Sequence, residues 1–113
     1  MLKKNNRISR DKEFDRVFKT GQSFYGGALG VKSAPNELTE TRFGIIINTK
    51  VSKKAVVRNR FRRQLREIIR LELDKLKLGR DIVIIVFPLI LDKNYQDLEK
   101  ALQMGFKKLN LYK

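Results

Sequence analysis

Residues 55–78 read AVVRNRFRRQLREIIRLELDKLKL, and the rest of the architecture can be worked out from this segment because its two helical faces differ in chemistry. The apolar stripe holds Phe61, Leu65, Ile68, Ile69 and Leu76. The basic stripe, at offsets of 0, 3, 4, 7 and 11 residues, holds Asn59, Arg62, Arg63, Arg66 and Arg70. Gly79 follows, and glycine is common just past a helix end. The pattern predicts one long amphipathic helix over residues 55–78.

Apolar runs flank this predicted helix on both sides. Arg42–Asn48 contains three consecutive isoleucines, and Asp81–Phe87 contains an unbroken run of isoleucine and valine before Pro88. Continuous apolar runs of this length are typical of strands that are covered on both faces. A strand, a helix and a second strand in succession predict a parallel pair of strands joined by a crossover helix.

Weaker patterns predict the remaining elements. The spacing of apolar residues predicts a helix over Ser9–Lys19, and a glycine-interrupted run predicts a weak, bulged strand over Ser23–Ser33. The polar segment 36–41 is expected to turn the chain so that this strand pairs antiparallel with Arg42–Asn48. A last helix begins at Asn94, a good N-cap with an acidic residue three positions later. The prediction is an α+β fold, an α-β sandwich of order αββαβα, in a single domain over residues 1–113.

Charge is the strongest signal in the composition. The chain has 26 Lys and Arg against 12 Asp and Glu, a formal net charge of +14. Such a surface favours a polyanionic partner, and nucleic acid is the commonest one. No apolar run approaches the ~20 residues that span a bilayer, and the first ten residues lack the apolar stretch of a signal peptide. We expect a cytoplasmic protein with no membrane partner that binds single-stranded or irregular RNA in preference to duplex DNA.

The chain contains no Cys and no His. Their absence removes most nucleophilic and zinc-based mechanisms, so the polypeptide alone is a poor candidate catalyst and no catalytic or metal-binding residue is assigned. The basic stripe has a simpler interpretation as a solvated surface. Its preference for Arg over Lys favours RNA binding instead. One guanidinium group can donate two hydrogen bonds to the oxygens of one phosphate, and it can also stack on bases.

The run Lys53-Lys54-Ala55-Val56-Val57-Arg58-Asn59-Arg60-Phe61-Arg62-Arg63-Gln64-Leu65-Arg66-Glu67 resembles the Arg-Asn-Arg signature of the bacterial ribonuclease P protein subunit. The spacing from Glu13 through Phe18 to Gly21, and the strands beginning at Phe43 and Asp81, resemble that family in the same order. The resemblance implies the fold class called ribosomal protein S5 domain 2-like. It also implies a role in cutting the 5′ leader from precursor tRNA, as part of an endoribonuclease whose catalytic centre and magnesium ions belong mainly to the partner RNA.

Carried onto this sequence, the resemblance implies two groups of RNA-binding residues. The candidates for the catalytic RNA are Arg58, Asn59, Arg60, Arg62, Arg63, Arg66 and Arg70. The candidates for the leader of precursor tRNA are Phe14, Phe18, Lys50 and Lys53. Aromatic rings can stack on bases and ammonium groups can contact phosphates, although two Phe one helical turn apart are more often core residues.

Three features depart from the family pattern. The loop before the signature reads Asn48-Thr49-Lys50-Val51-Ser52, where many members carry a second Lys and a Gly. Lys32 stands where an aromatic residue is common, and Phe87 stands where Arg is frequent, so the leader cleft is a candidate for remodelling. Two other functions remain open at this stage. A structural RNA-binding protein of the ribosomal type accounts for charge and fold equally well, whereas a protein-only nuclease would require a cluster of carboxylates.

Overall fold

The computed structural model describes residues 4–113, which form three α-helices, three short 3-10 helices and one four-stranded sheet. The α-helices are α1 (Asp11–Thr20), α2 (Ala55–Glu72) and α3 (Tyr95–Lys108), and the strands are β1 (Gln22–Gly26), β2 (Leu29–Pro35), β3 (Arg42–Ile46) and β4 (Arg80–Val86). The 3-10 helices are η1 (Lys4–Asn6), η2 (Leu73–Lys75) and η3 (Pro88–Asp92). The predicted α+β class is confirmed.

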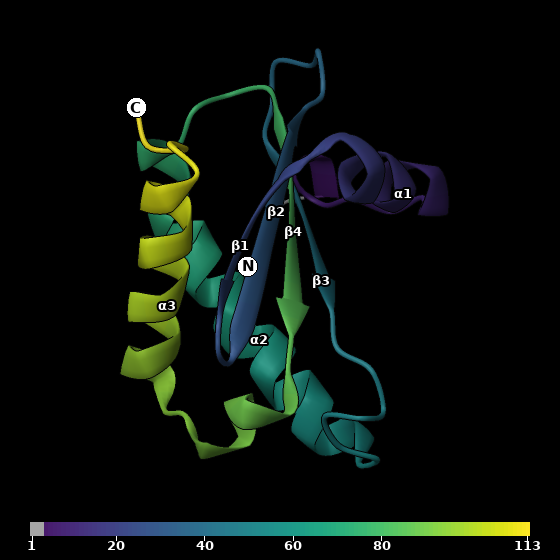
Figure 1. Ribbon diagram of the computed structural model, residues 1–113, viewed down its shortest axis with the longest axis vertical. Helices are drawn as coiled ribbons and strands as arrows, with labels where there is room; N and C mark the ends of the chain where they lie inside the picture. Colours follow the sequence, from purple (N-terminus) through teal and green to yellow (C-terminus); the bar gives the residue numbers. More distant parts are fainter. Residues whose placement is uncertain (1–3) are drawn as a thin grey trace.

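The sheet separates two layers of helices. Figure 1 shows α1 on one side of the sheet and α2 with α3 on the other. The larger core cluster packs α2 and α3 side chains such as Leu65 and Leu102 against the sheet residues Val31, Ile82 and Ile84. Because side chains alternate between the two faces of a strand, the next sheet residues along each strand face α1.

The strand order is β1-β2-β4-β3, with β4 inside the sheet. β3 and β4 are parallel and α2 connects them, which confirms the predicted crossover. The expected antiparallel pairing across the polar segment 36–41 is wrong, because β2 pairs antiparallel with β4 and not with β3. β4 takes the central place because its continuous apolar run suits a strand that is covered on both faces.

The predicted strand over Ser23–Ser33 is also corrected. It forms the two antiparallel strands β1 and β2, so the element order gains one strand relative to αββαβα. Gly26 pairs with Leu29 across a tight turn, and Gly27 adopts a φ of +65° there. Glycine takes this conformation without steric cost, so the glycines mark a hairpin and not a bulge.

The helix ends differ from the predicted ones in two places. α1 begins at Asp11, after the predicted start at Ser9, and α2 ends at Glu72, six residues before the predicted end at Leu78. The last part of that segment instead forms η2 and an isolated bridge between Leu76 and Tyr112. The predicted start of α3 is confirmed, since Asn94 accepts a hydrogen bond from the amide of Asp97 in a capping box.

Within residues 4–113, no helix is both long enough and apolar enough to cross a membrane.

Candidate RNA-binding surfaces

The arginine face of α2 is the first of two candidate surfaces. α2 buries Phe61, Leu65, Ile68 and Ile69 against the sheet, which leaves the other side of the helix outward. We define the arginine face as the seven predicted residues, of which Asn59, Arg60, Arg63 and Arg70 are exposed and Arg58, Arg62 and Arg66 are half-buried.

Some members of this face already have partners within the protein. A guanidinium nitrogen of Arg58 donates to the carbonyl of Ser52 at 2.8 Å and so ties the preceding loop to α2. Arg70 forms an ion pair with Glu67 at 2.6 Å. Among the described residues, Arg63 and Arg66 have no ion pair, so their charge is available to an external anion.

Arg66 lies in a concentrated positive field. Burial, followed by the charges of Arg62 and Arg7, lowers the pKa of Arg66. A phosphate group placed here would relieve the repulsion between these cations, which is the condition under which counterion release favours RNA binding. Arg7 comes from the segment before α1 and was not among the predicted residues, because one isolated Arg carries no sequence pattern.

A cleft of about 960 Å³ connects the arginine face with α1. Its walls come from residues 4–5 and 7–10, the start of α1, the loop 38–40, β3 and Arg66 of α2. Phe14 lies in this wall, and its ring covers Gly44 so closely that a Cβ atom at that glycine would be 2.3 Å from the ring. Phe14 therefore packs α1 onto β3 and borders the cleft.

The second surface lies on the sheet beside α1, and we call Phe18, Tyr25, Lys32 and Phe87 the aromatic face. The side chains of Phe18 and Tyr25 are 41% and 55% exposed. The Lys32 ammonium is 5.4 Å from the Phe18 ring centroid and 5.5 Å from that of Tyr25. The Tyr25 and Phe87 rings are 6.1 Å apart. Two exposed rings beside one cation, with the half-buried Phe87 ring next to Tyr25, form a surface suited to stacking with bases.

The structure divides the predicted leader-binding residues. Phe18 belongs to the aromatic face, and Phe14 lies at the neighbouring cleft. Lys50 and Lys53 are exposed in the loop between β3 and α2, at the end of β3 opposite to the one that α1 approaches (Figure 1). Two of the predicted departures, Lys32 and Phe87, lie on the aromatic face. Tyr25 was missed, because a single Tyr in a glycine-rich run gives no periodic signal.

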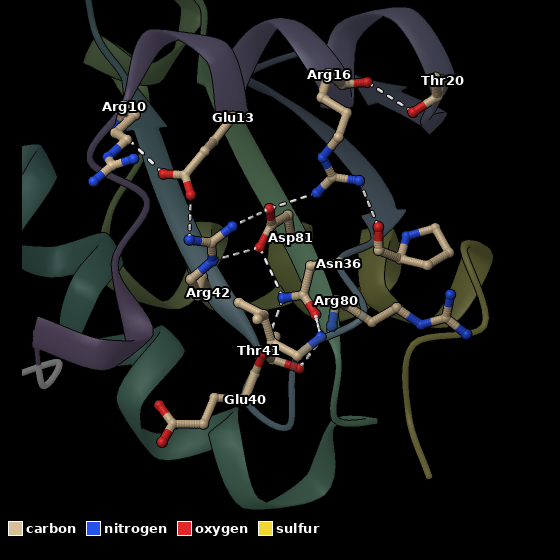
Figure 2. A network of polar contacts seen from close by, with 12 residues as sticks. Arg10, Glu13, Arg16, Thr20, Asn36, Glu40, Thr41, Arg42, Arg80 and Asp81 are labelled. Atoms are coloured by element: carbon tan, nitrogen blue, oxygen red, sulfur yellow. Dashed lines mark hydrogen bonds and ion pairs between the residues drawn. The ribbon is translucent and has the colours of Figure 1, made fainter.

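A polar network fixes α1 over the sheet (Figure 2). Asp81, at the start of β4, is fully buried and accepts hydrogen bonds from Arg42 at 2.9 and 2.7 Å, from Arg16 at 2.6 Å and from Asn36 at 2.9 Å. Arg42 also pairs with Glu13. Because Glu13 and Arg16 belong to α1, the network joins that helix to β3 and β4.

The same network controls the ionisation of Asp81. Burial acts to raise the pKa of Asp81, but the hydrogen bonds from Arg42, Asn36 and Arg16 outweigh it and hold the pKa below its ordinary value. The carboxylate therefore stays charged at neutral pH. Within the described residues 4–113, no group of three or more acidic side chains is placed to hold a metal ion.

An α+β domain with an arginine-rich helix on one side and a basic aromatic sheet surface on the other defines the class of small basic RNA-binding proteins. The family model described as Ribonuclease P matches residues 2–110. The chain belongs to this family, the bacterial ribonuclease P protein component, whose role is RNA binding and the 5′ maturation of tRNA within an endoribonuclease complex.

Sequence and structural relatives agree on this family. The ribonuclease P protein component of Pseudanabaena sp. is 43% identical over 99 residues, covering 87% of this chain and 85% of the relative. That of Clostridium botulinum strain 657 is 38% identical over 110 residues, covering 96% and 98%. The solved ribonuclease P protein of Staphylococcus aureus superposes with a TM-score of 0.88 at 26% identity, covering 96% and 98%. The solved ribonuclease P protein of Thermotoga maritima superposes with a TM-score of 0.79 at 27% identity, covering 89% of this chain and 96% of that one.

Proposed function

We propose that the protein binds the catalytic RNA of ribonuclease P through the arginine face and the 5′ leader of precursor tRNA through the aromatic face. The observation that carries the first part is the cluster of cations around Arg66. Burial, followed by the charges of Arg62 and Arg7, lowers the pKa of Arg66, and no ion pair among the described residues relieves the charge. The second part is supported by the exposed rings of Phe18 and Tyr25 beside Lys32.

The proposal assigns the chemical step to the RNA. The protein has no His and no Cys, so it lacks the residues most often used as general base or nucleophile. Magnesium ions, bound mainly by the partner RNA, would stabilise the charge that develops on the cleaved phosphate. The protein then contributes substrate affinity, in the bacterial cytoplasm where tRNA is matured. Membership of the ribonuclease P family favours this function over a structural ribosomal role.

Reconstitution tests the proposed function. Bacterial ribonuclease P RNA and precursor tRNA are mixed at low magnesium with and without the protein, and mature 5′ ends are quantified. We expect the protein to stimulate cleavage in the presence of the RNA and to cleave nothing alone at any magnesium concentration. Cleavage by repurified protein alone would move the chemistry into the polypeptide, and absence of stimulation would leave only a structural RNA-binding role.

A further inference from the structure

The ring of Tyr25 lies against the sheet at Gly30 and leaves its outer side exposed. Its ring covers Gly30 so closely that a Cβ atom at that glycine would be 2.7 Å from Tyr25 Cδ1 and 3.4 Å from the Phe87 ring. Any side chain at position 30 would therefore lift the Tyr25 ring off the sheet. With glycine there, one side of the ring contacts the backbone and 55% of the side chain remains exposed, so a base can stack on the outer side.

Lys32 places one ammonium group among the rings. Lys32 Nζ donates to Ser23 Oγ at 2.8 Å, and it lies 5.4 and 5.5 Å from the ring centroids of Phe18 and Tyr25. The ammonium also lowers the pKa of Tyr25 by interacting with its hydroxyl. No carboxylate in residues 4–113 pairs with Lys32. An ammonium has three donors. One goes to Ser23 and one interacts with the Tyr25 hydroxyl, so one is free, and a ligand that displaces the Tyr25 contact would receive two.

The chemistry of an ammonium beside a stacking platform distinguishes among the bases. Guanine presents two adjacent acceptors, O6 and N7, whereas adenine places an amino donor beside N7 and cytosine presents an amino donor. An ammonium donates only, so it satisfies both guanine acceptors and meets a competing donor on adenine or cytosine. Uracil offers a single carbonyl on the equivalent edge.

We propose that Lys32 makes the aromatic face selective for guanine at one position of the 5′ leader. The base stacks on Tyr25, and the Lys32 ammonium donates to O6 and N7 at its edge. This inference rests on the proposed function, because it assumes that the leader lies on this face. Contact between Lys32 and a phosphate would instead weaken binding equally for every leader sequence.

The test measures the dissociation constants of the reconstituted holoenzyme for precursor tRNAs that carry each of the four nucleotides at each leader position in turn. We expect one position where guanine binds about tenfold more tightly than adenine, the lower range of discrimination for a good base contact. Lys32→Gln should reduce this ratio to below about twofold. Lys32→Arg, which keeps a donor-only cation able to contact guanine O6 and N7, should retain the preference.

Lys108→Gln is the matched control, because it removes the same charge from an exposed position on α3, on the other side of the sheet. It should leave the guanine preference unchanged. The inference is overturned if no position prefers guanine, if Lys32→Gln keeps the preference, or if Lys32→Gln weakens all leaders equally. Equal affinity of the wild type for precursor and mature tRNA would overturn the proposed leader contact as well, so the two failures are distinguishable.

Discussion

Phe14 and Phe18 are one helical turn apart, yet the structure gives them different surroundings. The Phe14 ring is half-buried on Gly44 and packs with the smaller core cluster under α1. Phe18 is 41% exposed and lies beside Lys32. The first ring therefore contributes chiefly to folding, and the second is available to a ligand.

We predict that Phe18→Ala reduces the affinity of the holoenzyme for precursor tRNA by roughly tenfold, since stacking of a base on an aromatic ring is worth about 1 to 3 kcal/mol. Affinity for mature tRNA, which has no leader, should not change. Binding titrations with the two RNAs measure the difference, and thermal melting should show an intact fold because the ring is largely exposed.

Phe14→Ala serves as the comparison. It should lower the free energy of unfolding by about 2 kcal/mol or more, because it removes a packed ring and leaves a cavity over Gly44. An equal loss of affinity for precursor and mature tRNA in Phe18→Ala would contradict its assignment to the leader.

At the scale of elements, α1 is held on the sheet by charge as well as by apolar packing. Its Arg16 and Glu13 meet the Arg42–Asp81 pair, which connects the starts of β3 and β4. A buried carboxylate is stable only when its hydrogen bonds are satisfied, and Asp81 accepts four. The position of α1, and with it that of Phe18 over the sheet, depends on this residue.

We predict that Asp81→Ala lowers the free energy of unfolding by about 3 to 5 kcal/mol at pH 7, because it leaves Arg42 and Arg16 without their shared partner. Because the pKa of Asp81 is lower in the folded state, its stabilising contribution is present above the unfolded pKa, near 3.8, and is lost as pH falls through the folded value. Urea denaturation at pH 7 and at pH 3 should therefore show a smaller difference between wild type and variant at pH 3.

Asp92→Ala provides the control for this prediction. Asp92 is exposed in η3 and forms none of the ion pairs found in residues 4–113, so its removal should change stability by no more than about 0.5 kcal/mol. A stability of Asp81→Ala equal to that of Asp92→Ala would show that the network does not hold α1.

Local patterns were enough to predict some elements and not others. The capping box at Asn94 and the parallel strands around α2 depend on short-range signals, and both are confirmed. The end of α2 was wrong because Glu72 is buried and accepts a hydrogen bond from the hydroxyl of Tyr112, forty residues away. A contact between residues so far apart in the sequence leaves no mark on helical periodicity.

The two candidate RNA-binding surfaces also differ in how far local patterns could predict them. The arginine face could be predicted because its residues share one helix, and their roles toward RNA stay predictions. The aromatic face could not be assembled from periodicity, because its residues come from separate elements. The family resemblance placed Phe18, Lys32 and Phe87 at the leader cleft, and Tyr25 was missed. Only the pairing of β1 with β2, and of β2 with β4, brings them together.

At the scale of the whole molecule, the net charge of +14 does not by itself determine where RNA binds. Both the lysines on the outer side of α3 and the arginine face of α2 contribute to this net charge. Binding that depends on total charge would be insensitive to which cations are removed, whereas a defined surface would lose affinity only when its own cations are changed.

We predict that the combined change Arg62→Ala, Arg63→Ala and Arg66→Ala makes the dependence of the logarithm of RNA affinity on the logarithm of salt concentration shallower by about three, one for each lost phosphate contact. The affinity itself should fall at every salt concentration. The measurement is a salt titration of binding to ribonuclease P RNA, with circular dichroism to verify the fold.

The matched variant removes three exposed charges from α3 through Lys100→Ala, Lys107→Ala and Lys108→Ala. It has the same net charge as the arginine variant, so it should change the salt dependence much less. Equal effects of the two triple variants would show that the arginine face is a solvated surface.

The central position of β4 also determines when the molecule can fold during its synthesis. β2 and β3 do not pair with each other, so the hairpin of β1 and β2 stays separate from β3 until residues 80–86 exist. α2 is translated before that, with its apolar stripe uncovered. At typical rates of translation, the ribosome needs about one to three seconds to add residues 73–86. During that interval the strongly basic helix segment has no complete sheet against which to bury its apolar stripe.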